Sequence, residues 1–273
     1  ALDSFRAKWI TRFHPEGRLN EIFDPMTKDD KMNFLASMEG FETPNNPLIN
    51  QALNVADLNR KEIAAGAIAR GVRSKFLGKS TRPFVARTNY APHFTLDPTN
   101  LLTNPQEIED SLQYAVRIKR FTNVDDARKV WDAYGEARRM NFKGIDVPVT
   151  AKNKPFFDWL VKTGQAKDIE TASKLFVRQM RRADTPSFAS LETSRLIDIP
   201  FYQTDPQNIL LRYYSGAAKR FGEIDHFGLN DEVPNKLINE ISKNVDVKDA
   251  QDITHMFNLI TGKERPSEML SFA

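Results

Sequence analysis

Apolar residues recur every three or four positions along most of this chain, and this spacing places side chains on one face of an α-helix. The clearest case is the segment 205–228, DPQNILLRYYSGAAKRFGEIDHFG. Asp205 can accept a hydrogen bond from an early backbone N–H, and Pro206 has no N–H to leave unpaired at the first helical position. The stripe that follows consists of Leu210, Tyr213, Tyr214, Ala217 and Phe221. The segment is therefore predicted to be one helix whose stripe packs into a core or an interface.

The same pattern, with caps and glycine stops, predicts helices over most of the remaining chain. The expected ranges are about 3–13, 19–23, 29–38, 48–77, 105–116, 125–140, 155–161, 168–182, 231–243 and 248–260. Two long segments, about 78–98 and 183–204, lack a helical period and are expected to be irregular links that include short strands, one of them near 84–87. The predicted fold class is mainly α, a multi-helix array with these two links.

Residues 1–98 are expected to form an N-terminal helical region that ends in the first irregular segment, and residues 99–273 a C-terminal helical region. One continuous domain is the alternative, since 273 residues suit either arrangement. The first residue is Ala1 and not Met, as expected of a processed product or of a fragment of a longer protein. The first turn lacks the basic start and apolar block of a signal peptide, and no apolar run approaches the roughly 20 residues that span a bilayer.

The small net charge of +3 hides a segregation of charge along the chain. Residues 60–87 carry eight basic and one acidic side chains, and residues 112–143 carry eight basic and four acidic ones. Residues 1–59 have six basic against nine acidic side chains, and residues 223–273 have five against ten. A basic middle between acidic ends is expected to attract nucleic acid or an acidic protein surface, or to be neutralised within the chain or between neighbouring copies.

The candidate contacts to a partner or to nucleic acid are the basic residues of these segments and of the flank of the 205–228 helix. They are Arg70, Arg73, Lys75, Lys79, Arg82, Arg87, Arg117, Lys119, Arg120, Arg212, Lys219 and Arg220. Interleaved aromatic residues could stack on bases, but no helix-turn-helix, zinc-finger or RNA-recognition signature accompanies them. A solvated helix face is the other interpretation of these residues.

No catalytic or metal-binding signature stands out, so neither an enzyme nor a cofactor is expected. Gly78-Lys79-Ser80 ends like a phosphate-binding loop, but the required earlier glycine position holds Arg73, and a helix is predicted before it instead of a strand. The chain has no cysteine, which excludes disulfides and thiolate metal sites and suits a protein made in the cytosol. Asp252 and His255 lie one helical turn apart, but no second pair with this spacing completes a metal site.

Two segments resemble large virion proteins of tailed bacteriophages. Asn89, Tyr90, Pro92 and His93 match an N-Y-x-P-H motif. A second motif runs from an Arg and an apolar stretch through D-P-x-x-x-L-x-x-Y-x-x-x-A-x-R to F-G, and its matching residues within 195–228 are Asp205, Pro206, Leu210, Tyr213 and Ala217. Lys219 stands where the family has Arg. The resemblance covers about a fifth of the chain.

This resemblance implies an internal, ejection-related or head-associated protein of a phage particle, made in the bacterial cytoplasm and located in the virion. The expected function is non-enzymatic assembly through protein–protein packing, near packaged or ejected DNA. The implied partners are portal, capsid or tail and ejection proteins, further copies of the chain, and DNA. Two alternatives stay open: a nucleic-acid-binding helical module that uses residues 60–90 and 112–143, and a helical accessory domain of a larger phage enzyme.

Overall fold

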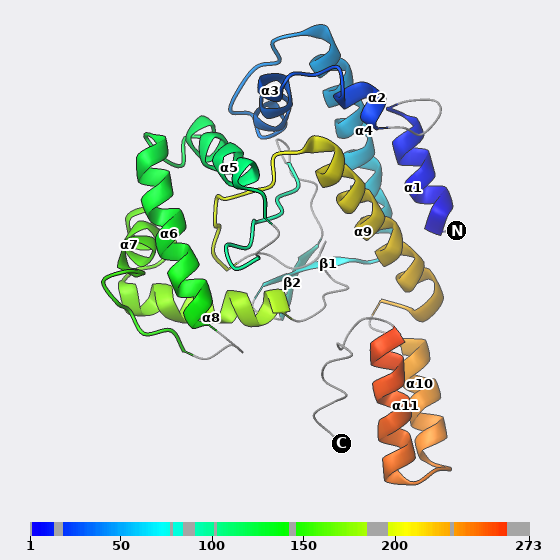
Figure 1. The fold of residues 1–273 in the computed structure, drawn as a ribbon. Helices are drawn as coiled ribbons and strands as arrows, with labels where there is room; N and C mark the ends of the chain where they lie inside the picture. The colour runs from blue at the N-terminus through cyan, green and yellow to red at the C-terminus, as the bar shows by residue number, and fades with distance from the viewer. Residues whose placement is uncertain are drawn as a thin grey trace.

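The computed structural model of the chain describes residues 2–13, 19–76, 79–83, 91–100, 103–141, 146–184, 196–229 and 232–260. These residues form eleven α-helices and one two-stranded antiparallel sheet (Figure 1). The prediction of a mainly α fold is therefore confirmed. The helices are α1 (Leu2–Thr11), α2 (Asn20–Phe23), α3 (Lys28–Met38), α4 (Pro47–Ala69), α5 (Pro105–Arg117), α6 (Val124–Met140), α7 (Lys154–Lys162), α8 (Ile169–Asp184), α9 (Pro206–Phe227), α10 (Glu232–Ser242) and α11 (Val247–Ile260).

The main departure from the predicted helices lies after α4, which ends at Ala69 and does not reach residue 77. Gly71 adopts a φ of 69°, and the N–H of Val72 donates to the carbonyl of Ala67 at 3.0 Å, which closes the helix end. The chain then forms β1 (Arg73–Phe76) and β2 (Lys79–Pro83), which we call the ribbon. A positive φ is cheap at glycine, so Gly71 stops the helix where the apolar period alone would continue it. The strand expected near 84–87 lies outside the described residues.

The first hydrophobic core joins the N-terminal helices to a helix from late in the chain. It contains side chains of α1 to α4, together with Tyr114, Ile118, Tyr202 and the buried stripe of α9. Trp9 of α1 is fully buried. The centroid of its ring lies 5.9 Å from the ring centroid of Tyr214 and 6.2 Å from that of Phe221. This core draws on residues from both sides of position 98. The expected division into 1–98 and 99–273 stays a prediction.

The second hydrophobic core is built from α5 to α8, the group coloured green in Figure 1. Aromatic rings dominate it: Phe156 lies 5.3 Å from Tyr134 and 5.4 Å from Phe176, measured between ring centroids. Phe201, from the segment before α9, is fully buried here and lies 5.2 Å from Trp131.

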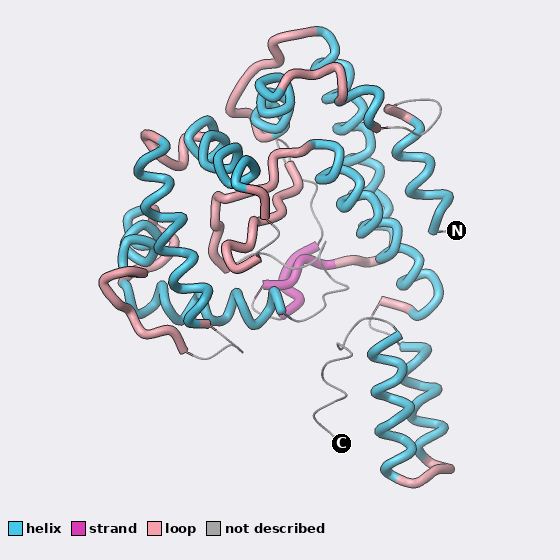
Figure 2. Tube along the Cα trace, in the orientation of Figure 1, coloured by secondary structure: helices cyan, strands magenta, loops and turns pink. Residues whose placement is uncertain are grey.

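The two segments that were predicted to be irregular meet between the cores. The N–H of Leu96 donates to the carbonyl of Phe201 at 2.7 Å, and the N–H of Gln203 donates to that of Phe94 at 2.8 Å. These bonds make an antiparallel bridge, drawn among the central loops of Figure 2. Consecutive side chains of an extended segment point to opposite sides, so Phe201 enters the second core while Tyr202 enters the first. We call residues 94–96 and 201–203 the partition.

The described side chains of the last two helices belong to neither core. In Figure 1, α10 and α11 lie side by side and extend away from the remaining helices, and α10 packs against α11 and against α9. We call residues 232–260 the arm. Val247 is 75% exposed, Leu237 60% and Met256 57%, which makes the arm the part of the described chain with the most exposed large apolar side chains.

Candidate functional site

The two motifs of the phage resemblance meet at the partition. The side chain of Asp205 caps α9 by accepting a hydrogen bond from the N–H of Gln207 at 3.0 Å, and Pro206 occupies the first turn. Tyr202, three residues earlier, stacks on His93 of the other motif, with ring centroids 3.9 Å apart and ring planes at 6°. Segments more than a hundred residues apart in sequence therefore share one site. Asn89 and Tyr90 lie outside the described residues.

The stripe of α9 lies where its spacing predicted. Leu210, Tyr214, Ala217 and Phe221 are buried in the first core, and Tyr213 packs against it. Ala218, next to this stripe, is also buried.

The basic flank of α9 was wrongly predicted at one position. Arg220 is 4% exposed, donates from Nη2 to the carbonyl of Leu229 at 3.0 Å, and so closes the turn after α9. Its long side chain reaches back from the helix to a carbonyl of the next segment, which the helical period does not reveal. Lys219 is exposed and its Nζ lies 3.9 Å from Oε1 of Glu223. Arg212 donates from Nη1 to Oε1 of Gln203 at 2.9 Å, and its Cζ lies 4.1 Å from the centroid of the Phe94 ring. Arg212 therefore connects α9 to the partition.

A small group of titratable side chains surrounds His93, and we call it the junction cluster. Its members are Glu39, His93, Tyr114 and Tyr202. The hydroxyl of Tyr114 donates to Oε1 of Glu39 at 2.6 Å, and Nε2 of His93 lies 2.9 Å from the same oxygen. Burial raises the pKa of Tyr114 well above its usual range, and the Glu39 carboxylate raises it further. The hydroxyl of Tyr202 donates to Asp198. The cluster thus connects the end of α3 and α5 to the two segments that form the partition.

Two predicted contact residues, Arg117 at the end of α5 and Arg120 just after it, pair with carboxylates of the same chain. Arg117 donates from Nε to Glu42 at 2.6 Å and from Nη1 to Asp29 at 2.7 Å, which links α5 to α3. Arg120 donates to Asp198 at 2.9 Å. Lys119, between them, has a φ of 59° at the end of α5 and is exposed. The two arginines therefore hold elements of the chain together, and Lys119 and Arg120 are both exposed.

Arg70 has a similar internal role at the end of α4. Its guanidinium makes a bidentate pair with Asp225 of α9 at 2.8 and 2.7 Å. It also lies 4.4 Å from the centroid of the Phe221 ring, a cation–π contact. The remaining candidates Arg73, Lys75, Lys79 and Arg82 belong to the ribbon, and Arg87 lies outside the described residues.

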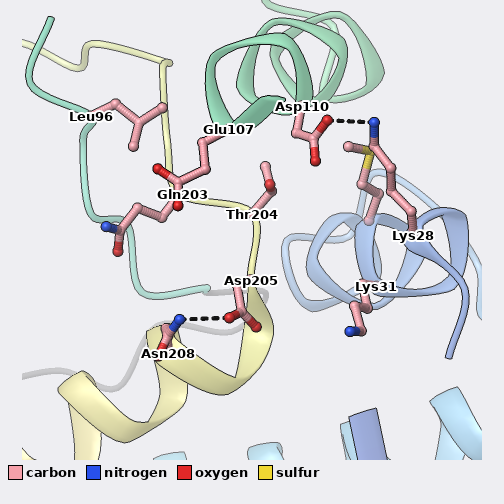
Figure 3. A pocket seen from close by; sticks show the side chains of 10 residues that line it. Lys28, Lys31, Leu96, Glu107, Asp110, Gln203, Thr204, Asp205 and Asn208 are labelled. Carbon is pink, nitrogen blue, oxygen red and sulfur yellow. Dashed lines mark hydrogen bonds and ion pairs between the residues drawn. The ribbon is translucent and has the colours of Figure 1, made fainter. Parts of the chain in front are cut away.

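A cavity of about 320 Å³ opens beside the partition, between α3, α5 and the start of α9 (Figure 3). Several of its polar side chains bind one another. Lys28 pairs with Asp110 across it, and Asp205 accepts a hydrogen bond from Asn208 at 2.6 Å. The volume lies at the lower end of the range for small-molecule sites, and these polar groups already serve helix capping and helix pairing. We therefore interpret this cavity as a space left where α3, α5 and the start of α9 pack together.

The junction cluster and the ribbon were not predicted from the sequence. The cluster depends on Glu39 and Tyr114, which no local motif marks. The sequence did contain an indication of the ribbon. Gly71 precedes the ribbon, Pro83 ends it, and Gly78 lies between its strands. Helix stops on both sides of a short segment favour a hairpin over a helix.

The hydrogen bond from Tyr114 to Glu39 yields a first prediction. Tyr114→Phe leaves the 8% exposed Glu39 carboxylate without that donor, so the free energy of unfolding should fall by about 1 kcal/mol. Urea unfolding followed by circular dichroism measures the change. In a Glu39→Gln background the same substitution should cost less, because the acceptor is then neutral. An equal cost in both backgrounds would contradict the contact.

The described residues hold no group of three or more metal-capable His, Asp or Glu side chains. In the same part of the chain, no helix combines the length and the apolar character needed to cross a membrane. Comparison of the chain with protein-family models, with curated proteins and with solved structures found no match. Function is therefore inferred from the geometry of this chain.

Proposed function

We propose that this chain is a non-enzymatic structural component of a tailed-phage particle, which acts by packing against other virion proteins. The observation that carries the packing role is the arm. It stands outside both cores and exposes Leu237, Val247 and Met256 by more than half of their surface. Apolar surface left in water costs about 25 cal/mol per Å², so a partner that covers the arm gains free energy. The assignment to a phage particle depends on the two motifs that meet at the partition.

Ion pairs within the chain reduce the set of basic residues that the alternative role, nucleic-acid binding, could use. Arg70, Arg117 and Arg120 pair with carboxylates of this chain, and paired cations release few counterions on binding phosphate. The ribbon keeps four basic residues and no acidic one in residues 73–83. A nucleic-acid role is thus best assigned to the ribbon and not to residues 112–143.

Particle proteomics tests the proposed function. Purified virions of the phage that encodes this chain are expected to contain it at a fixed copy number relative to the capsid protein. Lysate of infected cells from which the particles have been removed serves as the control for contamination. Finding the chain only in that cleared lysate would refute the proposal.

A further inference from the structure

We propose that the arm binds an amphipathic helix of another protein, one whose apolar stripe is flanked by lysine or arginine. The inference rests on the proposed packing function and names the class of partner that the arm takes. Its basis is an apolar face of the arm that lies in water, together with two carboxylates on the same side that have no partner among the described residues.

The arm is a helical hairpin without a closed core of its own. The short turn 243–246 joins α10 to α11, so the two helices run antiparallel, and they lie side by side in Figure 1. Of the side chains that the structure describes between Lys236 and Met256, none is buried. Helices of 11 and 14 residues are marginal in water by themselves. A further helix packed on the hairpin would therefore stabilise it.

Apolar side chains of both helices share one face of the arm. Ile241 of α10 and Ile253 of α11 are half-buried, as expected at the line where the two helices pack on each other. Leu237 precedes Ile241 by four residues and is 60% exposed. Met256 follows Ile253 by three residues and is 57% exposed. At about 100° per residue, these steps turn about 40° and about 60° round the two helices in the same sense. In antiparallel helices equal senses lead to the same face of the pair, so Leu237 and Met256 lie on one side of the arm.

Two aspartates of α11 lie on the same side as Met256. Asp252 precedes Met256 by four residues and Asp249 by seven, and both are exposed. Within the part of the chain that the structure describes, neither carboxylate accepts a hydrogen bond or makes an ion pair. Asp249 lies in the first turn, where the helix dipole favours negative charge, but Asp252 lies beyond it. The arm as a whole is also acidic, since residues 232–260 carry five acidic and three basic side chains.

The sign of this charge decides between classes of partner. Carboxylates repel the phosphates of nucleic acid and of anionic lipids, and the arm of a second copy would bring the same carboxylates against each other. A helix with basic residues beside an apolar stripe would instead cover Leu237 and Met256 while its cations meet Asp249 and Asp252. Such a helix would lie along α10 and α11 as the third member of a bundle. The projection of the arm from the body in Figure 1 leaves this side open to it.

Fluorescence anisotropy with labelled model peptides tests this contact in the full chain. The probe is a helix of about 15 residues built from leucine and lysine, with leucine at helical spacing, and its counterpart carries glutamate in place of lysine. The chain is expected to bind the leucine–lysine peptide, more weakly at about 500 mM than at about 50 mM salt. It should bind the leucine–glutamate peptide at least tenfold more weakly, because like charges then meet.

Two variants separate the apolar part of the contact from the charged part. Leu237→Ser with Met256→Ser should weaken binding of the leucine–lysine peptide at least tenfold, because both large apolar contacts are lost. Asp249→Asn with Asp252→Asn should weaken it roughly fivefold and reduce its salt dependence, since exposed ion pairs contribute little each. Circular dichroism should show wild-type helicity for both variants.

The matched controls make the same changes at exposed positions outside the arm. They are Leu58→Ser on α4 and Asp125→Asn with Asp132→Asn on α6, and both should leave peptide binding unchanged. Equal binding of the two peptides, no binding of either, or an equal loss in the controls would overturn the proposal.

Two further outcomes would replace the partner. Self-association of the chain that is lost in Leu237→Ser with Met256→Ser, without peptide binding, would overturn the proposal in favour of a second copy. Binding to anionic lipid vesicles that the same variant loses would overturn it in favour of a membrane surface. A chain that is present in virions but does not bind the leucine–lysine peptide would refute this contact and leave the proposed function standing.

Discussion

Phe201→Ala is expected to lower the free energy of unfolding by about 3–5 kcal/mol, the usual cost of truncating a buried phenylalanine to alanine. Phe201 is fully buried and contacts Trp131, Tyr134 and Phe121 in the second core, with ring centroids 5.2, 6.3 and 5.8 Å away. Rings on several sides restrict collapse of the cavity, which keeps the cost high. Urea unfolding followed by circular dichroism measures it.

The same variant tests whether the two cores unfold together. Trp9 reports on the first core, and Trp131 and Trp159 report on the second. Because the partition supplies Phe201 to one core and Tyr202 to the other, we expect the tryptophan transitions to shift together. Leu58→Ala, at a site that is 53% exposed, is the control and should cost well under 1 kcal/mol. A shift confined to Trp131 and Trp159 would show that the cores unfold independently.

Gly66→Val is expected to lower the free energy of unfolding by about 3 kcal/mol, at the upper end of the cost of overpacking a core. Gly66 lies where α4 and α9 cross. A Cβ placed there would come within 2.7 Å of Cε2 and 2.9 Å of Cζ of Phe221. Phe221 is 1% exposed and belongs to the first core, so its ring is enclosed by other side chains. Thermal or urea unfolding gives the measurement.

Gly216→Val on α9 is the matched control, because a Cβ at Gly216 meets no atom within 4 Å. It should leave stability unchanged or raise it by a few tenths of a kcal/mol, since valine is a better helix former than glycine. A Phe221→Leu background should reduce the cost of Gly66→Val, because the smaller side chain can yield. Equal effects of valine at the two glycines would contradict the close crossing of the helices.

The helices could be predicted from the sequence because their starts are local. Asn104 and Asp205 cap α5 and α9 through their own side chains, and each is followed by a proline in the first turn. The end of α4 was placed too late, since apolar and basic residues continue past Ala69 in a helical spacing. Gly71 decides that end through its backbone, and its presence alone was compatible with a locally weakened helix.

The candidate site was harder to predict, because it depends on contacts between distant segments. Asp205 caps α9 and His93 contacts Glu39, but nothing local in the sequence indicates that His93 stacks on Tyr202. The helical period likewise does not show that Gly66 lies against the Phe221 ring whereas Gly216 faces open space. Pairing of Arg117 with Asp29 and Glu42 likewise depends on how α5 lies against α3. The function inferred from the resemblance stays a prediction.

The position of α9 in the first core has a consequence for synthesis on the ribosome. The N-terminal helices are complete by residue 72, but the stripe that covers them ends at Ile224. At about 5–20 residues per second, translation of the intervening residues takes about 8–30 s. During that interval the apolar sides of α1 to α4 await their cover. The nascent chain is therefore expected to be a client of ribosome-associated chaperones until α9 emerges.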